Sequence, residues 1–211
     1  MTDQEYPVDH VDLDDLLIHQ LLPQTRVSRT LDGIIMRLGS AVSWCWILLL
    51  LIVVINVVMR KVFAQGRIEF EEVQWHIYSA GFLFGLSYTY VADDHVRVDV
   101  LRERMKPVTQ AWIELYGTLL LLLPFLLLII VYATPFVYYS FQLSEISEAP
   151  GGLPYRWAVK ALLPIGFLFL LAATISRLSR LTSFLFGWPA ALVSLGGSAA
   201  IATDRSPETR V

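Results

Sequence analysis

Four long runs without Lys, Arg, Asp or Glu constrain the fold of this 211-residue chain more than any other feature. The runs cover residues 38–59, 73–92, 115–144 and 161–176. The hydrocarbon core of a bilayer is about 30 Å thick, and about 20 apolar helical residues span it. Three runs are long enough, and Trp157 and Lys160 extend the fourth because their side chains suit the interface. We predict an all-α membrane protein, a bundle of four transmembrane helices at about residues 38–59, 73–92, 112–141 and 158–177.

The chain outside these spans divides into two end segments. Residues 1–30 are acidic, and their leucines between residues 13 and 22 recur at helical spacing. A short amphipathic helix and an irregular acidic tail are both consistent with this pattern. Residues 31–181 then form the membrane domain, and residues 182–211 form a C-terminal tail. Glycine and proline interrupt the uncharged stretch at 181–202, so we interpret it as tail in preference to a fifth membrane segment.

Basic residues near the predicted spans indicate the orientation of the chain. Cytoplasmic loops carry an excess of Lys and Arg close to membrane spans. With the N-terminus inside, nine basic residues flank the spans on the inner side and five flank them on the outer side. Arg60 and Lys61 are among the outer five and oppose this assignment. The majority predicts that both termini are cytoplasmic.

The uncharged runs also restrict the function. Ionised side chains at membrane depth are costly and usually mark paths for ions or polar solutes. Because the runs contain none, we predict that the chain does not itself carry a charged solute. Of the four histidines only His76 lies in a predicted span, which argues against a haem held by two histidines. We expect no enzyme activity, cofactor or metal, and the sequence has no basic patch typical of nucleic-acid binding.

Small residues mark the second predicted span. Gly81 and Gly85 are four residues apart, with Ser and Thr nearby. Small residues at this spacing let two helix backbones approach closely. The pair predicts a helix contact, and the sequence leaves open whether the partner helix belongs to this chain or to another subunit.

Eight charged residues gather in the fourteen positions 93–106, between the second and third spans. His95 and Asp99 lie four residues apart, but two ligands are too few for a metal site. Asp93 and Arg97 have the spacing of a helical ion pair. From residue 98 onward the apolar side chains share one helical face, which predicts a short cytoplasmic amphipathic helix between spans two and three.

The second span opens with acidic residues. Glu71 and Glu72 lie where a helix begins, and they would face the positive end of its dipole. Trp75 follows, and tryptophan is enriched at the membrane–water interface. These features alone indicate only a four-helix membrane protein.

Four motifs together resemble a known family. They are NVVMRKVF at residues 56–63, EEVQW at 71–75, DDHVRVDVL at 93–101 and GGLPYRW at 151–157. The pattern, over roughly residues 38–178, is similar to the DctQ-like small membrane subunit of tripartite ATP-independent periplasmic (TRAP) transporters. In that family an acid pair opens the second span, and an Asp-His-x-Arg-x-Asp sequence closes it. In this chain those positions are Glu71, Glu72, Asp94, His95, Arg97 and Asp99.

The resemblance implies a non-catalytic scaffold in the bacterial inner membrane. The implied partners are a large multi-span permease that carries solute with sodium, a periplasmic solute-binding protein and membrane lipid. The solute of such transporters is usually an organic acid. The family positions, together with Trp75, Gly81 and Gly85, form either a partner interface or a structural clasp. A membrane anchor or sensor subunit of another complex is the alternative interpretation.

Overall fold

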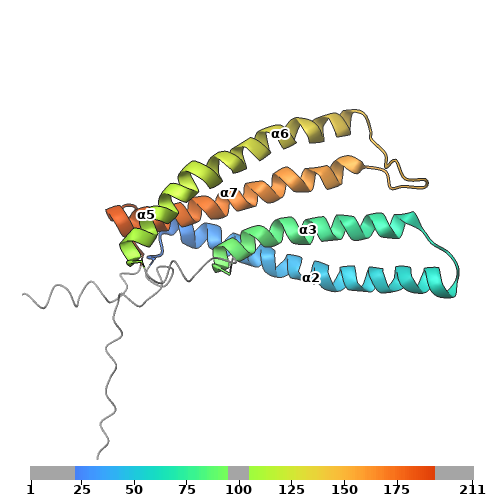
Figure 1. Cartoon of the computed structure of the whole chain (residues 1–211), viewed down its shortest axis with the longest axis horizontal. Helices are drawn as coiled ribbons and strands as arrows, with labels where there is room; N and C mark the ends of the chain where they lie inside the picture. Colours follow the sequence, from blue (N-terminus) through green and yellow to red (C-terminus); the bar gives the residue numbers. More distant parts are fainter. Residues whose placement is uncertain (1–21, 95–104, 193–211) are drawn as a thin grey trace, which may run out of the picture.

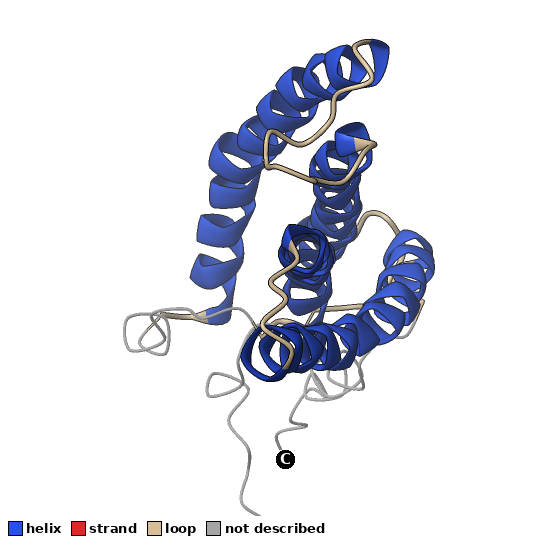
Figure 2. Cartoon of the chain, turned by 90° about the vertical axis from the view of Figure 1, so that its right-hand side faces the viewer, coloured by secondary structure: helices blue, strands red, loops and turns tan. Residues whose placement is uncertain are grey.

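The computed structural model describes residues 22–94 and 105–192. Every regular element in these two ranges is helical (Figures 1 and 2). The elements are α2 (Arg26–Val62), α3 (Ile68–Ala92), α5 (Pro107–Gly117), the π turn η1 (Thr118–Leu122), α6 (Leu123–Gln142) and α7 (Arg156–Phe186). The predicted all-α fold is therefore confirmed for this part of the chain. The predicted amphipathic helix falls largely outside the described residues, as do His95, Arg97 and Asp99.

Helix α7 is central to the bundle. It packs against α2, α3, α5 and α6, and α2 also packs against α3. Figure 1 shows α3 and α2 on one side of α7 and α6 on the other. The α2–α3 and α6–α7 connections lie together at one end, which Figure 2 views directly. Following the predicted orientation, we call this the outer end, and the opposite end, where α5 lies, the inner end.

Three described helices are long and apolar enough to cross a membrane: α2, the continuous helix from Pro107 to Gln142, and α7. α3 has 25 residues, which is long enough, but it is not among these three helices, and its sequence contains Glu, Gln, Gly, Ser and Thr residues. The crossing through α3 therefore stays a prediction. Helices α2 and α7 are also longer than the uncharged runs that predicted them, since α2 begins at Arg26 and α7 continues to Phe186.

The stretch considered for a fifth span begins inside α7. Residues 181–186 are its last turns, and Gly187 ends the helix with a left-handed backbone (φ 68°). A positive φ carries little cost at glycine, which is why glycine commonly terminates helices. Residues 193–202 of this stretch lie outside the described part of the chain.

Two glycines let α3 approach both of its neighbours closely. At Gly39 of α2, a Cβ would overlap the ring of Tyr88 on α3. At Gly166 of α7, a Cβ would lie 2.8 Å from the Cβ of Leu83, which is also on α3. Only a residue without a side chain fits at either contact, so these glycines set the separations of α3 from α2 and from α7.

The two small residues predicted to mediate a helix contact have different environments. Gly81 is buried, and a Cβ there would lie 3.3 Å from the indole of Trp46 on α2. A Cβ at Gly85 would meet nothing within 4 Å. Gly85 lines an open groove of about 360 Å³ between α2 and α3, together with Ser43 and Thr89. Gly81 therefore packs within this chain, whereas the surface at Gly85 is open.

The helix from Pro107 to Gln142 contains a π turn directly before a proline. The amide of Leu123 donates to the carbonyl of Thr118, five residues earlier, instead of to the fourth residue back. Pro124 follows, and it has no amide hydrogen to donate. π turns and prolines are both recognised causes of helix bending. Figure 1 shows that α5 and α6 follow a curved path along α7.

Candidate functional site at the two ends of the bundle

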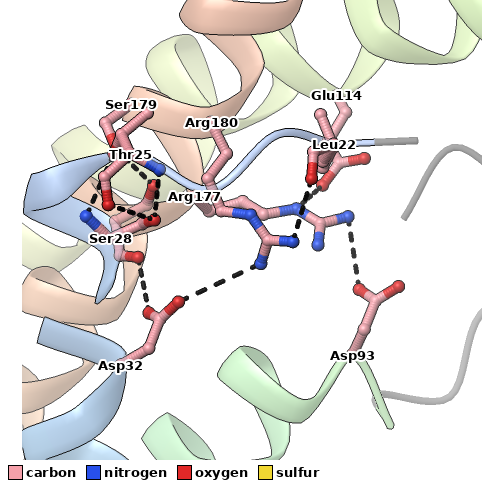
Figure 3. A network of polar contacts seen from close by, with 10 residues as sticks. Leu22, Thr25, Ser28, Asp32, Asp93, Glu114, Arg177, Ser179 and Arg180 are labelled. Carbon is pink, nitrogen blue, oxygen red and sulfur yellow. Dashed lines mark hydrogen bonds and ion pairs between the residues drawn. The ribbon is translucent and has the colours of Figure 1, made fainter. Parts of the chain in front are cut away.

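The inner end is organised around Arg177, whose side chain on α7 is only 5% exposed. Its Nε donates to Oε1 of Glu114 on α5 at 2.6 Å. Its Nη2 lies 3.3 Å from Oδ1 of Asp93, at the end of α3 (Figure 3). A buried charge is costly unless it is paired and hydrogen-bonded. Glu114 supplies a hydrogen bond at Nε, and Asp93 supplies an ion pair at Nη2. The three residues, which we call the inner junction, join α3, α5 and α7.

Asp93 reaches the inner junction because α3 ends directly before it. It has a left-handed backbone (φ 61°, ψ 20°), and its amide donates to the carbonyl of Thr89. Aspartate tolerates this conformation better than most residues, because its short side chain hydrogen-bonds locally. The ion pair expected between Asp93 and Arg97 stays a prediction. Arg97 itself lies outside the described residues.

A second set of contacts ties the start of α2 to the end of α7. Asp32 accepts a hydrogen bond from the Ser176 hydroxyl at 2.5 Å, and its other oxygen lies 4.0 Å from Nη1 of Arg180. The hydroxyl of Thr25, which caps α2, lies 2.9 Å from that of Ser179 (Figure 3). These contacts hold the first turns of α2 against α7 next to the inner junction.

The cavity inside this polar region is small. It measures about 10 Å³ and is bordered by Asp32, Tyr90, Ser176, Arg177 and Arg180, among others. A volume of this size admits about one water molecule. Among the described residues, the charges that border this cavity contact each other, and the space between them is too small for an organic solute.

Glu72 on α3 holds the α6–α7 connection at the outer end. Its Oε1 accepts a hydrogen bond from the Ser147 hydroxyl, and its Oε2 accepts one from the Leu153 amide at 2.5 Å. The Leu153 amide, followed by the Ser147 hydroxyl, holds the pKa of Glu72 below its ordinary value. We call Glu72, Ser147 and Leu153 the outer clasp. The outer clasp holds the connection to α3, in addition to the covalent links of the connection to α6 and α7.

Glu145 makes a further contact at the start of the same connection. Its Oε2 pairs with Nζ of Lys160, and its Oε1 lies 3.7 Å from Nε of Arg156. The hydrogen bond from Lys160 is the main reason that the pKa of Glu145 lies below its ordinary value. Both basic residues belong to the first turns of α7. Glu145 therefore links the two ends of the connection to each other.

The site residues predicted from the sequence have different surroundings. Glu72 takes part in the outer clasp, whereas Glu71 is exposed, because neighbouring residues of a helix point in different directions. Trp75 is 70% exposed. Asp94 is exposed at the inner end, beside Asp93. The structure thus gives Glu72 a clear contact within the chain and leaves the side chains of the other three accessible.

Sequence reasoning missed Arg177, Glu114 and Glu145 as site residues. Arg177 and Glu114 each border an uncharged run, and both are on the side predicted to be cytoplasmic. Charges that border packed membrane helices on the same side lie close together, so this shared side is a usable signal. The signal does not select partners, because several charged residues occur on that side.

The inner junction and the outer clasp both lie in the part of the chain that matches a known family. A family model described as tripartite ATP-independent periplasmic transporters, DctQ component, matches residues 49–184. The chain belongs to this DctQ family. The assignment made from the sequence motifs is confirmed, and this DctQ-family chain is a small subunit of a TRAP transporter. No curated protein sequence matches it.

The family match does not cover every contact at the inner end. Thr25 and Asp32 precede the matched range, whereas Ser176, Ser179 and Arg180 lie within it. The link between the start of α2 and the end of α7 is therefore partly a feature of this DctQ-family chain outside the matched region.

Proposed function

We propose that this DctQ-family chain is a non-catalytic scaffold, the small permease subunit of a TRAP-type secondary transporter in a bacterial inner membrane. It braces a large permease that carries an organic acid by symport with sodium. A periplasmic solute-binding protein delivers the solute, and both termini of the small subunit are cytoplasmic. The observation that supports this role best, beside the family match, is that the ion pairs of the described residues join helix ends to each other.

The distribution of contacts favours a stationary part of the transporter. Arg177 and Arg180 are paired at the inner end, and Glu145 is paired at the outer end. Between these ends, α3 and α7 approach through Gly166 and Leu83. Transporter subunits that bind solute usually place charges or broken helices at mid-membrane. A bundle fastened at both ends is better suited to support a moving partner than to move.

The large permease requires a binding surface, and we assign it to the exposed family positions. Glu71 and Trp75 are exposed at the outer end, and Asp94 is exposed at the inner end, where the family motif continues through residues 95–99. The groove at Gly85 provides a place for a partner helix to approach α2 and α3 closely. Exposure and groove shape support these assignments.

The outer clasp supports a second partner, the solute-binding protein. Residues 143–155 connect α6 to α7 at the outer end, and Glu72 and Glu145 hold this connection in place. A fixed surface loses less conformational entropy on binding than a flexible one. We assign the outer face of this connection to docking of the binding protein.

Purification and reconstitution test the proposal. Tagged chain isolated in mild detergent should retain the large permease. In liposomes, chain, permease and binding protein together should take up an organic acid when a sodium gradient is applied, whereas the chain alone should not. Uptake by the chain alone would overturn the scaffold role. Recovery of a different partner in place of a permease would favour an anchor or sensor subunit of another complex.

A further inference from the structure

The outward face of α2 carries arginines that neither the inner junction nor the proposed scaffold role uses. Arg26, Arg29 and Arg37 are exposed, and Ser40 and Trp44 continue the same face toward the apolar part of the helix. At 3.6 residues per turn, these five positions lie within about 80° of arc. Trp44 is 70% exposed. We call the five residues the arginine stripe.

The arginine stripe faces away from the bundle. Ile35 and Gly39 are buried on the other side of α2, and Asp32, the only acidic residue of this helix, contacts α7. Gly33 lies on the stripe's side, and a Cβ there would meet nothing within 4 Å. Among the described residues, none of the three guanidinium groups of the stripe forms an ion pair.

The helix itself is not stabilised by two of these charges. Arg26 and Arg29 lie at the start of α2, whose first turn contains no acidic residue. Cations there oppose the positive end of the helix dipole. Their position is unfavourable for the helix alone, which points to an anionic ligand outside it.

We propose that the arginine stripe binds the headgroup of an anionic phospholipid. Guanidinium groups bind phosphate oxygens in pairs, and tryptophan is enriched at the depth of the headgroups. Beyond Trp44 the same face continues with exposed Ile47 and Leu51, which suit acyl chains. The order from basic through Ser40 and Trp44 to aliphatic follows the change from headgroup to hydrocarbon across one leaflet. This charge complementarity and order favour a phospholipid over a protein helix, and the proposal does not depend on the transporter role.

Native mass spectrometry of the full chain in mild detergent tests the proposal, with phosphatidylglycerol and phosphatidylcholine as separate probes. The variant combines Arg26→Gln, Arg29→Gln and Arg37→Gln. Each basic residue near an anionic lipid surface contributes about fivefold to affinity, so the variant should lose roughly a hundredfold for phosphatidylglycerol. Its affinity for phosphatidylcholine, whose phosphate is balanced by a choline cation, should fall much less. The matched control, Arg60→Gln with Lys61→Gln at the other end of α2, should bind both lipids like the parent.

Three results would overturn the proposal. The first is unchanged phosphatidylglycerol affinity in the triple variant, and the second is an equal loss for both lipids. The third comes from a photo-crosslinker at position 40 in the chain isolated from membranes: labelling of a protein in place of phospholipid would make the stripe a protein contact. If the triple variant does not fold, Arg37→Gln alone carries the comparison, with an expected loss of about fivefold.

Discussion

Arg177 connects three elements because its guanidinium is planar and offers donors in several directions at once. Glu114 takes the Nε–H, and Asp93 lies against Nη2, so α5 and the end of α3 both contact one side chain of α7. Asp93 and Glu114 are the nearest described junction residues on either side of residues 95–104. The inner junction therefore fixes both ends of the stretch that carries most of the family motif.

Replacement of Arg177 by alanine should strongly destabilise the protein. Asp93 and Glu114 would lose the guanidinium of Arg177 at a poorly hydrated site, and removal of one partner from a buried ion pair costs about 3–5 kcal/mol. Thermal denaturation of purified protein in detergent, followed by circular dichroism, measures the effect. Arg60→Ala, at an exposed position of α2, is the control and should change stability by less than about 0.5 kcal/mol. Equal melting temperatures for the two variants would contradict the importance of the inner junction.

At the scale of elements, α3 depends on close packing more than on apolar content. It is not among the three helices that are apolar enough to cross a membrane, yet it approaches α2 at Gly39 and α7 at Gly166. The long helices could be predicted from uncharged runs, because hydrocarbon excludes unpaired charges. The close approaches could not, since Gly39 and Gly166 have no spacing pattern that separates them from Gly85. The arrangement at the helix ends was predicted least well, because the contacts of Asp93 and Glu72 are with residues distant in sequence.

Gly166→Ala should separate α3 from α7 and destabilise the bundle by about 1–3 kcal/mol, the usual cost of overpacking. The new methyl group would lie 2.8 Å from the Cβ of Leu83, which cannot move without its backbone. Gly85→Ala is the matched control, because its methyl group enters open space. Alanine also favours helix over glycine, so this control should be neutral or stabilising by up to about 1 kcal/mol. Chemical denaturation of both variants gives the comparison, and a greater loss in the control would refute the packing argument.

The contacts of the α6–α7 connection predict a loss of stability in acid. The folded-state pKa values of Glu72 and Glu145 lie below the ordinary value of 4.5, so both carboxylates stabilise the fold fully above about pH 4.5. As the pH falls through the lower folded-state values, protonation weakens their contacts with Leu153 and Lys160. Tm measured from about pH 7 to pH 3 should fall on the acid side. The Glu72→Gln and Glu145→Gln double variant should start lower and fall less, and an equal fall would be evidence against this account.

At the scale of the whole molecule, α6 packs against fewer of the long described helices than α2, α3 or α7 does. Among the longer helices it packs against α7, while α7 packs against α2 and α3 as well. Large apolar side chains such as Leu128, Val131 and Tyr132 are exposed along α6. Lipid or a partner subunit must cover this surface in a membrane, which agrees with the proposed place of the chain inside a larger complex.

Replacement of Arg97 or Asp99 by alanine should weaken association with the large permease, or lead to degradation of the subunit. Both belong to the family motif that follows Asp94, and the inner junction holds the chain on either side of them. Co-purification of tagged variants with the permease, together with uptake rates, measures the effect. Arg102→Ala, in the same stretch but outside the motif, is the control. Normal yield of the complex and normal uptake in both motif variants would exclude this role.

The π turn in the helix from Pro107 to Gln142 changes which residues of that helix lie on its packing face. Ala111 and Thr118 are buried and lie seven residues apart. The same spacing continued along the chain leads to Phe125 and Tyr132, which are 53% and 71% exposed.

The buried positions are instead the next ones along, Leu126 at 0% and Ala133 at 6% exposure. The wide turn at residues 118–122 contains one residue more than an α-helical turn, so the packing face moves forward by one position. A natural variant that lacked a single residue in this turn would form a regular α-helix there and would still direct the leucine and the alanine against α7. The present sequence without the wide turn would instead direct a phenylalanine and a tyrosine against α7.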